Sequence, residues 1–384
     1  MKLINRPTYI ERLKQLRGTP DIKVMTGVRR CGKSELLKAF AKYIQSANAN
    51  ANIIDIDFNS LEFDGLREYH ALHQYVSERY KEGRENVVLI DEVQMCPKFE
   101  LAINSLHASF KYDIYLTGSN AFLLSSDLAT LFTGRFIQIH IFPFSFQEFC
   151  AYFDDERDMG HLLERYIVEG GLAGSYLYNN ITDKLNYLKD IYQTIIIRDL
   201  ISKYRLSENS SLYRVGEFMM DNVGNLTSPN AIVGGLVSDK VDISRVTVNN
   251  YLEYLSSAFL LYKATRYDVR GKNHLRTLNK YYTVDTGLRF ALLGTRNMDW
   301  GRMLENTVYI ELLRRGYDVY VGKLYQKEID FVATRQSKKI YIQVSDYIGE
   351  PGTFEREIAP LRQIRDAYPK MILARTHTCL KYTS

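Results

Sequence analysis

One short segment near the start of the chain restricts its fold more than any other feature. Residues 27–34 read Gly-Val-Arg-Arg-Cys-Gly-Lys-Ser and follow a β-branched, apolar run, Ile22–Thr26. After this segment, apolar residues recur at the spacing of one helical face, at Leu36, Leu37, Phe40 and Ile44. Glycines at both ends let the backbone turn tightly and approach a bound group closely. The pattern G-x-x-x-x-G-K-S between a strand and a helix predicts a P-loop, the name used below for residues 27–34.

The P-loop predicts a site for ATP with Mg²⁺. Closely packed phosphate oxygens need many donors, which the backbone N–H groups of the loop and the amino end of the following helix supply. The Lys33 ammonium is expected to reach the β- and γ-phosphates, and the Ser34 hydroxyl to ligate Mg²⁺. A chance match in a glycine-containing turn is the alternative, against which the flanking strand and helix argue. The residues expected to bind the nucleotide are Gly27, Val28, Arg29, Arg30, Cys31, Gly32, Lys33, Ser34 and Glu35.

Two adjacent carboxylates follow a later apolar run. Asp91 and Glu92 come directly after Val-Val-Leu-Ile at 87–90. A buried strand of this kind delivers its acids at the carboxyl end of a parallel sheet, where ligands bind. We expect Asp91 to hold Mg²⁺ through water and Glu92 to act as the general base on the attacking water. The alternative is a solvated pair of acids that ends a strand.

Four other residues are weighed for the same site. The sequence Thr-Gly-Ser-Asn at 117–120 ends another predicted strand, where Asn120 or Ser119 would position the water beside the γ-phosphate. Turn chemistry explains these residues equally well. Arg135 precedes a strand and is a candidate arginine finger that acts in a neighbouring subunit, and an ordinary surface arginine is the alternative. Arg30 is expected to brace the loop or to contact another domain, and it is assigned no catalytic role.

The order of strand and helix patterns predicts an α/β fold with several modules. Between about residues 20 and 145, apolar strands alternate with helical stretches, which is typical of a parallel sheet flanked by helices. The predicted strands are Ile22–Thr26, Ile53–Phe58, Val87–Asp91, Ile114–Thr117 and Phe136–Ile141. Three helical segments and a strand-rich stretch after residue 209 follow the order of a winged helix. The predicted modules are a P-loop ATPase core at 1–145, a helical lid at 146–208, a winged helix at 209–295 and a small α/β domain at 296–384.

Several motifs together resemble a known family. The chain carries Gly-Val-Arg-Arg-Cys-Gly-Lys-Ser, Leu-Ile-Asp-Glu-Val-Gln, Leu-Thr-Gly-Ser-Asn-Ala and Phe-Pro-Phe-Ser-Phe-Gln-Glu-Phe in this order, followed by Gly170-Gly171-Leu172 and Val284-Asp285-Thr286-Gly287-Leu288. It resembles a widespread group of prokaryotic AAA-plus ATPases that carry a C-terminal domain of unknown function. The resemblance implies an ATPase, a winged helix and a domain similar to restriction-endonuclease-like nucleases. Members commonly have proline after Gly-Gly-Leu, where this chain has Ala173.

The last module lacks two residues that a restriction-type nuclease core needs. Glu305 and Asp330 match acidic positions of the layout, but Gln343 and Ser345 stand where the glutamate and lysine should be. An amide weakens metal binding, and serine removes the positive charge near the reacting phosphate. We expect a nuclease-like fold without nuclease activity, in which Glu305 and Asp330 are either structural or keep a residual role. Metal-dependent cleavage lost in Asp330→Ala would restore the nuclease hypothesis.

Basic residues gather in the predicted wing. The helix that starts at Ser244 is expected to bury its apolar side and to turn outward Arg245, Thr247, Asn249 and Asn250, which are base-reading types. The stretch 263–280 has a net charge of +5, equal to that of the whole chain. Its basic residues are Lys263, Arg266, Arg270, Lys272, Arg276 and Lys280. Contact with double-stranded DNA is one interpretation, and a packing module with a solvated edge is the other.

Composition limits the remaining classes. The four cysteines are scattered without a CxxC pair, so neither a zinc site nor a disulfide framework is expected. No apolar run approaches the roughly 18 residues that span a bilayer, and no signal peptide is evident at the start, so we expect a cytoplasmic protein without a membrane partner. The leading hypothesis is a DNA-associated ATP-driven switch or motor, acting as a homo-oligomer. The alternative is a signalling or scaffold NTPase whose nucleotide state controls oligomerisation and protein contacts.

Overall fold

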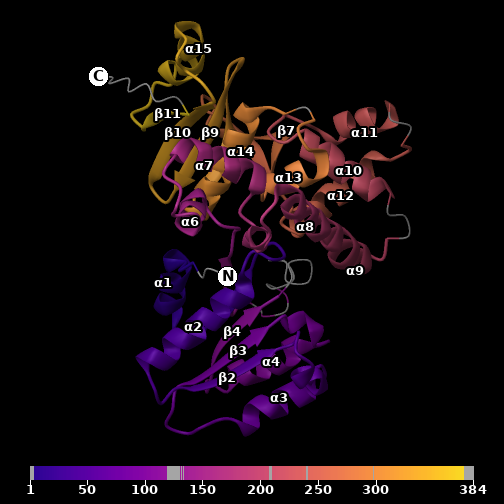
Figure 1. The fold of residues 1–384 in the computed structure, drawn as a ribbon, viewed down its shortest axis with the longest axis vertical. Helices are drawn as coiled ribbons and strands as arrows, with labels where there is room; N and C mark the ends of the chain where they lie inside the picture. Colours follow the sequence, from indigo (N-terminus) through magenta and orange to yellow (C-terminus); the bar gives the residue numbers. More distant parts are fainter. Residues whose placement is uncertain are drawn as a thin grey trace. The chain divides into compact units, whose positions relative to one another are not determined.

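The chain forms two compact units, each with its own sheet (Figure 1). The computed structural model describes residues 4–118, 130, 132, 134–206, 210–238, 241–296 and 298–375, without the side chains of 275–277. The first unit runs to Phe144 and also holds Thr194–Arg205 and Ser257–Phe259. The remaining described residues after Phe144 form the second unit.

The first unit contains the predicted parallel sheet. Its strand order is β2-β3-β4-β1-β5, and every pairing is parallel. The strands are β1 (Ile22–Thr26), β2 (Asn52–Asp57), β3 (Asn86–Asp91), β4 (Asp113–Thr117) and β5 (Phe136–His140). All five agree with the predicted strands to within one residue at each end. The predicted α/β fold class is therefore confirmed.

Helices cover both faces of this sheet. Every residue of β1, β3 and β4 is buried, as expected for central strands of a parallel sheet. On one face, α3 and α4 contribute Leu72, Val76 and Leu106 to the core. On the other face, the ring of Phe40 in α2 lies 4.9 Å from that of Tyr115 in β4. The helices are α1 (Pro7–Leu16), α2 (Lys33–Ala47), α3 (Tyr69–Glu78) and α4 (Phe99–Ala108), with 3₁₀ turns η1 (Leu61–Leu66) and η2 (Val93–Met95).

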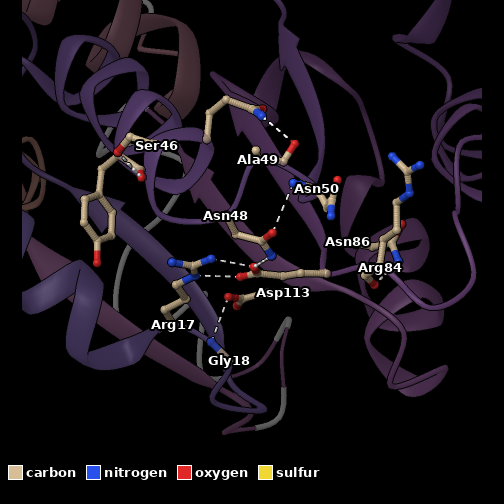
Figure 2. A network of polar contacts seen from close by, with 12 residues as sticks. Arg17, Gly18, Ser46, Asn48, Ala49, Asn50, Arg84, Asn86 and Asp113 are labelled. Carbon is tan, nitrogen blue, oxygen red and sulfur yellow. Dashed lines mark hydrogen bonds and ion pairs between the residues drawn. The ribbon is translucent and has the colours of Figure 1, made fainter.

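The amino edge of the sheet contains a buried, neutralised lysine. Lys23 Nζ lies 2.6 Å from Asp113 Oδ1 and 2.6 Å from the Thr19 carbonyl oxygen, and the Lys23 side chain is fully buried. The backbone N–H of Gly18 donates to the other oxygen of Asp113 at 2.9 Å. Figure 2 shows this contact within a wider polar network that includes Arg17. The network joins the segment before β1 to the start of β4.

Replacement of Asp113 with alanine is expected to lower the free energy of unfolding by about 3–5 kcal/mol, because the buried Lys23 charge loses its partner. Urea denaturation followed by circular dichroism measures the change. Asp64→Ala is the matched control, since Asp64 pairs with Arg67 at a more exposed position and its loss is expected to cost much less. Equal, small effects at the two positions would show that Asp113 does not stabilise Lys23.

The second unit is built on a six-stranded mixed sheet in the order β11-β10-β9-β8-β6-β7. Its strands are β6 (Leu261–Asp268), β7 (Asn273–Thr283), β8 (Asp318–Leu324), β9 (Lys327–Arg335), β10 (Lys338–Ser345) and β11 (Lys370–Ala374). The hairpin β6–β7 is the predicted wing. Strand β6 also pairs with β8 in parallel, at Arg266 with Val321. The hairpin and the C-terminal strands therefore share one sheet, although the expected module boundary at residue 295 lies between them.

The helices after Phe144 precede, interrupt and follow these strands in the chain, and two of them, η4 and α9, belong to the first unit. They are α6 (Phe146–Tyr152), α7 (Met159–Glu169), η3 (Ala173–Leu177), α8 (Ile181–Thr194), the π-helix η4 (Ile195–Ile201), α9 (Ser202–Tyr204), α10 (Ser210–Asp221), α11 (Pro229–Ser238), α12 (Arg245–Ser257), α13 (Thr286–Leu293), α14 (Trp300–Arg314) and α15 (Pro351–Arg362). Two serines cap the amino ends of helices. The Ser228 hydroxyl accepts a hydrogen bond from the Ala231 backbone N–H at the start of α11, and the Ser244 hydroxyl accepts one from the Thr247 N–H at the start of α12. Within the described ranges, no helix is long and apolar enough to cross a membrane.

A buried aspartate joins two of the family-like motifs in the second unit. Asp285 caps α13 by accepting from Gly287 N, and its other oxygen accepts from Gly171 N at 2.6 Å. Burial raises the pKa of Asp285 to about 6, against the lowering effect of these backbone donors. Gly170 has φ +72°, and an added Cβ would lie 1.8 Å from Asp285 Oδ1, so a side chain does not fit. The Gly-Gly segment thus packs directly on the cap, and Ala173 begins the turn η3.

Candidate nucleotide-binding site

The P-loop connects the end of β1 to the start of α2. It turns through three residues with positive φ, at Gly27 (152°), Arg30 (66°) and Gly32 (97°). A Cβ added at Gly27 would lie 2.1 Å from the Ile141 carbonyl oxygen, so only glycine fits there. Gly32 is the N-cap of α2 without a side-chain cap, which leaves the first backbone N–H groups of the helix for a ligand. This geometry is that of an anion site at a helix amino end.

Lys33 lies at the centre of this loop. Its side chain is buried, and Nζ donates to the carbonyl oxygens of Gly27 (2.9 Å) and Val28 (3.2 Å). Burial, with a smaller contribution from the Lys33 charge, lowers the pKa of His140 to about 3. His140 is therefore neutral at neutral pH. The positively charged Lys33 ammonium lies among the backbone carbonyls of the loop. Ser34 is half-buried in the next position.

Asp91 and Glu92 leave β3 at the same carboxyl edge of the sheet. The Thr117 hydroxyl at the end of β4 donates to Asp91 Oδ1 and accepts from the Glu92 backbone N–H (3.1 Å). Among the described residues, the buried Asp91 Oδ2 accepts no hydrogen bond. Thr117 therefore fixes both acids, a role that the sequence analysis missed. Its position at the end of the adjacent predicted strand was the available signal.

A divalent cation fits this edge. The free Oδ2 of Asp91 is a hard oxygen donor of the kind that Mg²⁺ prefers, and Mg²⁺ takes most of its other ligands from water and phosphate. Within the described part of the chain, no group of three or more His, Cys, Asp or Glu side chains is placed to hold a metal ion. A metal brought in with a triphosphate needs few protein ligands, and the predicted ones are Asp91 and Ser34.

Glu92 has an unusual backbone conformation. Its φ of 57° and ψ of 46° lie in the left-handed region, which a non-glycine residue rarely adopts. The Gln94 side-chain amide donates to Glu92 Oε2. Such strain persists only where the surroundings enforce it, and it concentrates at functional sites.

The other predicted site residues are distributed differently. Asn120 and Ser119 lie outside the described residues. Arg135 is exposed at the start of β5, where Phe136 pairs with Ile22 at the amino edge of the sheet. A five-residue strand separates this edge from the P-loop edge by roughly 17 Å, so the structure does not bring Arg135 to the site of its own chain.

Two of the side chains expected to bind the nucleotide, those of Arg29 and Glu35, pair with other residues. The Arg29 guanidinium pairs with Asp199 of η4. Arg30 is exposed, and Glu35 is exposed beside Lys38, 3.4 Å away. The Cys31 carbonyl accepts from Arg6 Nη1 at 3.1 Å.

Arg6 is a further residue that the sequence analysis missed. It is buried and also donates to the carbonyl oxygens of Phe142 and Pro143, and it packs on the rings of Tyr9 and Phe144. It thereby ties the P-loop to the segment that follows β5. No local motif marks an arginine whose partners lie 25 to 137 positions away.

The nuclease-like residues meet in the second unit around an unexpected lysine. Lys280 Nζ lies 2.9 Å from Glu305 and 2.7 Å from Glu328. Burial and then the Glu305 charge raise the pKa of Asp330 to about 8. The Gln343 amide donates to Glu357. Lys280 of β7 thus neutralises Glu305 of α14 and Glu328 of β9. Lys280 is buried, so the interpretation of this residue as an exposed charge of the wing is wrong.

The remaining surface of the predicted DNA-binding module agrees in part with the sequence analysis. In α12, Arg245, Asn249 and Asn250 are exposed, while the predicted apolar side is buried. On the hairpin, Lys263, Arg270 and Lys272 are exposed and Arg266 is half-buried. Arg270 stacks on the Tyr325 ring at 5.0 Å. The basic surface is therefore smaller than the count of charges suggests.

The sheet, the glycine-bounded loop and the paired acids define the class of protein, the AAA-type ATPases. A family model described as an AAA domain matches residues 19–150, and a model described as a domain of unknown function matches residues 160–299. A solved structure, the Walker-type ATPase of Pyrococcus abyssi, has a similar fold with a TM-score of 0.51 and 18% identity, over 76% of this chain and 96% of that chain. At this identity the likeness supports the fold alone.

Two relatives are similar to this chain over most of its length. An uncharacterized protein of Haemophilus influenzae is 39% identical over 376 residues, which cover 97% of this chain and 93% of the relative. The chain belongs to the same family as that protein, with an AAA domain followed by a domain of unknown function. An uncharacterized protein of Methanocaldococcus jannaschii is 27% identical over 372 residues, covering 93% of this chain and 80% of the relative.

Proposed function

We propose that this protein binds ATP with Mg²⁺ and hydrolyses it. The observation that carries the proposal is the meeting of a P-loop with Asp91 and Glu92 at one edge of a parallel sheet. Asp91 presents an oxygen that accepts no hydrogen bond from the described residues. Glu92 is held in a strained turn beside it. Ligands of open α/β sheets bind at this edge.

Each residue has a role that follows from its position. Lys33 exchanges its two loop carbonyls for phosphate oxygens and neutralises their charge. Ser34 and Asp91 would hold Mg²⁺, which when bound offsets negative charge on the phosphates. Glu92 accepts a proton from the attacking water, and Asn120 orients that water. The backbone N–H groups of residues 27–35 enclose the phosphates.

We also propose a homo-oligomer in which Arg135 acts on the nucleotide of a neighbouring subunit. In its own chain, Arg135 lies at the opposite edge of the sheet from the P-loop. Its exposure leaves it free to reach a second copy. An arginine finger supplied in this way stabilises the charge that develops on the transferred phosphoryl group.

The C-terminal modules are proposed to associate with double-stranded DNA, which makes the protein a DNA-associated switch or motor. The proposal keeps the division into core, lid, winged helix and nuclease-like domain, at 1–145, 146–208, 209–295 and 296–384. It is supported by the exposed polar side chains of α12 and by three exposed basic residues of the hairpin. Phosphate contacts of this kind supply affinity that falls with salt.

Turnover of ATP at low salt, with and without duplex, junction and single-stranded DNA, tests this function. We expect hydrolysis that Glu92→Gln abolishes and that duplex DNA accelerates. Replacing Lys263, Arg270 and Lys272 with glutamine should remove the acceleration but keep the basal rate. The same charge change at exposed Lys42, Lys81 and Arg84 of the first unit is the control. Hydrolysis that no DNA form changes would exclude the DNA part.

A second candidate function is a signalling or scaffold NTPase. It is favoured by the neutralisation of Lys280 and by the pairing of β6 with β8, which make the hairpin part of a packed sheet. Nucleotide state would then control oligomerisation and protein contacts. Unchanged turnover with DNA, combined with an ATP-dependent change of mass in light scattering, would support this function over the first.

A further inference from the structure

A buried arginine ahead of α1 contacts the backbone of the P-loop. Arg6 is 6% exposed, and its Nη1 atom donates to the Cys31 carbonyl oxygen at 3.1 Å. The other terminal nitrogen, Nη2, donates to the carbonyl oxygens of Phe142 and Pro143 at 2.8 and 3.3 Å. The guanidinium is planar and its donors have a fixed geometry. It therefore bridges two segments that are far apart in the sequence and fixes one against the other.

The segment after β5 gives Arg6 a fixed position. The Ile141 backbone N–H donates to the Thr26 carbonyl oxygen at 2.7 Å, which attaches this segment to the end of β1. The guanidinium carbon of Arg6 also lies 4.5 Å from the centre of the Tyr9 ring and 5.3 Å from that of Phe144. Cation–π contacts of this kind stabilise a desolvated guanidinium. Arg6 is thus held by its surroundings while it contacts the loop.

The contact with the loop determines the direction of one backbone donor. The Cys31 carbonyl and the Gly32 N–H belong to one peptide unit, and this peptide bond is trans. In a planar trans peptide the C=O and the N–H point in opposite directions. Because the carbonyl is directed at Arg6, the Gly32 N–H points away from the guanidinium. Gly32 is the N-cap of α2, and backbone N–H groups at the amino end of a helix bind anions.

We propose that Arg6 is a positioning residue for nucleotide binding, which keeps the peptide between Cys31 and Gly32 in the orientation that presents its N–H to the phosphates. This inference rests on the proposed function of the P-loop. Glycine restricts backbone rotation little, so without Arg6 the peptide samples other orientations. If the binding orientation were then populated about a tenth of the time, the affinity for phosphate would fall about tenfold.

Equilibrium binding of ATP with Mg²⁺, and of inorganic tripolyphosphate with Mg²⁺, to Arg6→Gln tests the proposal. We expect both affinities to fall about tenfold, because the lost orientation acts on the phosphates and not on the base. Arg6→Lys keeps the positive charge but lacks the planar fork that reaches both segments. Its affinities should lie between those of Arg6→Gln and the wild type. Isothermal titration calorimetry measures the affinities, and circular dichroism shows that each variant is folded at the temperature used.

Arg17→Gln is the matched control. Arg17 is the C-cap of α1 and pairs with Glu85, so this change also removes an arginine contact of the first unit. It leaves the contacts of Arg6 with the P-loop in place. Arg17→Gln should therefore bind both ligands as the wild type does, even if it melts at a lower temperature.

Three results would overturn the inference. Unchanged affinities in Arg6→Gln would show that the loop needs no bridge, and a loss for ATP that tripolyphosphate does not share would show that Arg6 acts on the base. Wild-type affinities in Arg6→Lys would show that charge suffices, and this comparison decides alone if Arg6→Gln does not fold. A wild-type protein that binds both ligands but hydrolyses no ATP would reject the proposed hydrolysis instead, and the affinities would still decide the role of Arg6.

Discussion

Glu92→Gln is expected to bind ATP with nearly wild-type affinity and to lower kcat by about 10²–10⁴-fold, the usual contribution of a general base. The amide keeps the size of the side chain but cannot accept a proton from water. The strained backbone at Glu92 belongs to the turn after β3, so glutamine should be accommodated without rearrangement of Asp91 or Thr117. Steady-state turnover and equilibrium binding of a fluorescent ATP analogue measure the two quantities separately.

Glu100→Gln is the matched control for this experiment. Glu100 lies in the first turn of α4, near β3 in sequence, and has no assigned role in the site. It should leave both kcat and affinity unchanged. Normal hydrolysis in Glu92→Gln would show that another group activates the water. The neighbouring carboxylate of Asp91 would then be the next candidate for the general base.

Lys33→Ala is expected to weaken ATP binding by roughly 30- to 5,000-fold, which corresponds to about 2–5 kcal/mol for the loss of one partner in a buried charge pair. The ammonium is buried, and among the described residues it donates to two loop carbonyls. Triphosphate offers oxygens with full negative charge instead, so the exchange favours binding. Isothermal titration with ATP and Mg²⁺ measures the affinity.

The control for Lys33→Ala separates loss of charge from loss of fold. Lys38→Ala removes a lysine from the same helix at a side chain that is 54% exposed and pairs with Glu35. Its affinity for ATP should equal that of the wild type. A Lys33→Ala protein that melts normally and still binds ATP tightly would contradict the assignment of the P-loop as the phosphate site.

Much of the first unit was predictable because its signals are local. Each strand is a short apolar run, and the P-loop joins one such run to an amphipathic helix. Asp91 and Glu92 come directly after another apolar run. In a parallel sheet the residues that follow a strand lie at its carboxyl edge, so the position of the two acids could be predicted. These predictions needed no knowledge of contacts between distant parts of the chain.

The parts that failed or were missed depend on distant pairs. Lys280 looked like one more charge of a basic hairpin, but Glu305 and Glu328, 25 and 48 positions later, neutralise it in the interior. Arg29 was expected to bind the nucleotide with the rest of the loop, and the partner of its side chain lies 170 positions away. A count of charges along the sequence does not show which charged residues form ion pairs in the folded protein.

The shared sheet of the second unit also limits where this chain can be divided. Strand β6 has a neighbour on each side, β7 and β8, and only the first of these precedes residue 295. A fragment that ended there would present the far side of β6 as a row of unpaired backbone groups, which invites association with other chains. A fragment that keeps this edge of β6 paired therefore has to include β8 together with β6 and β7.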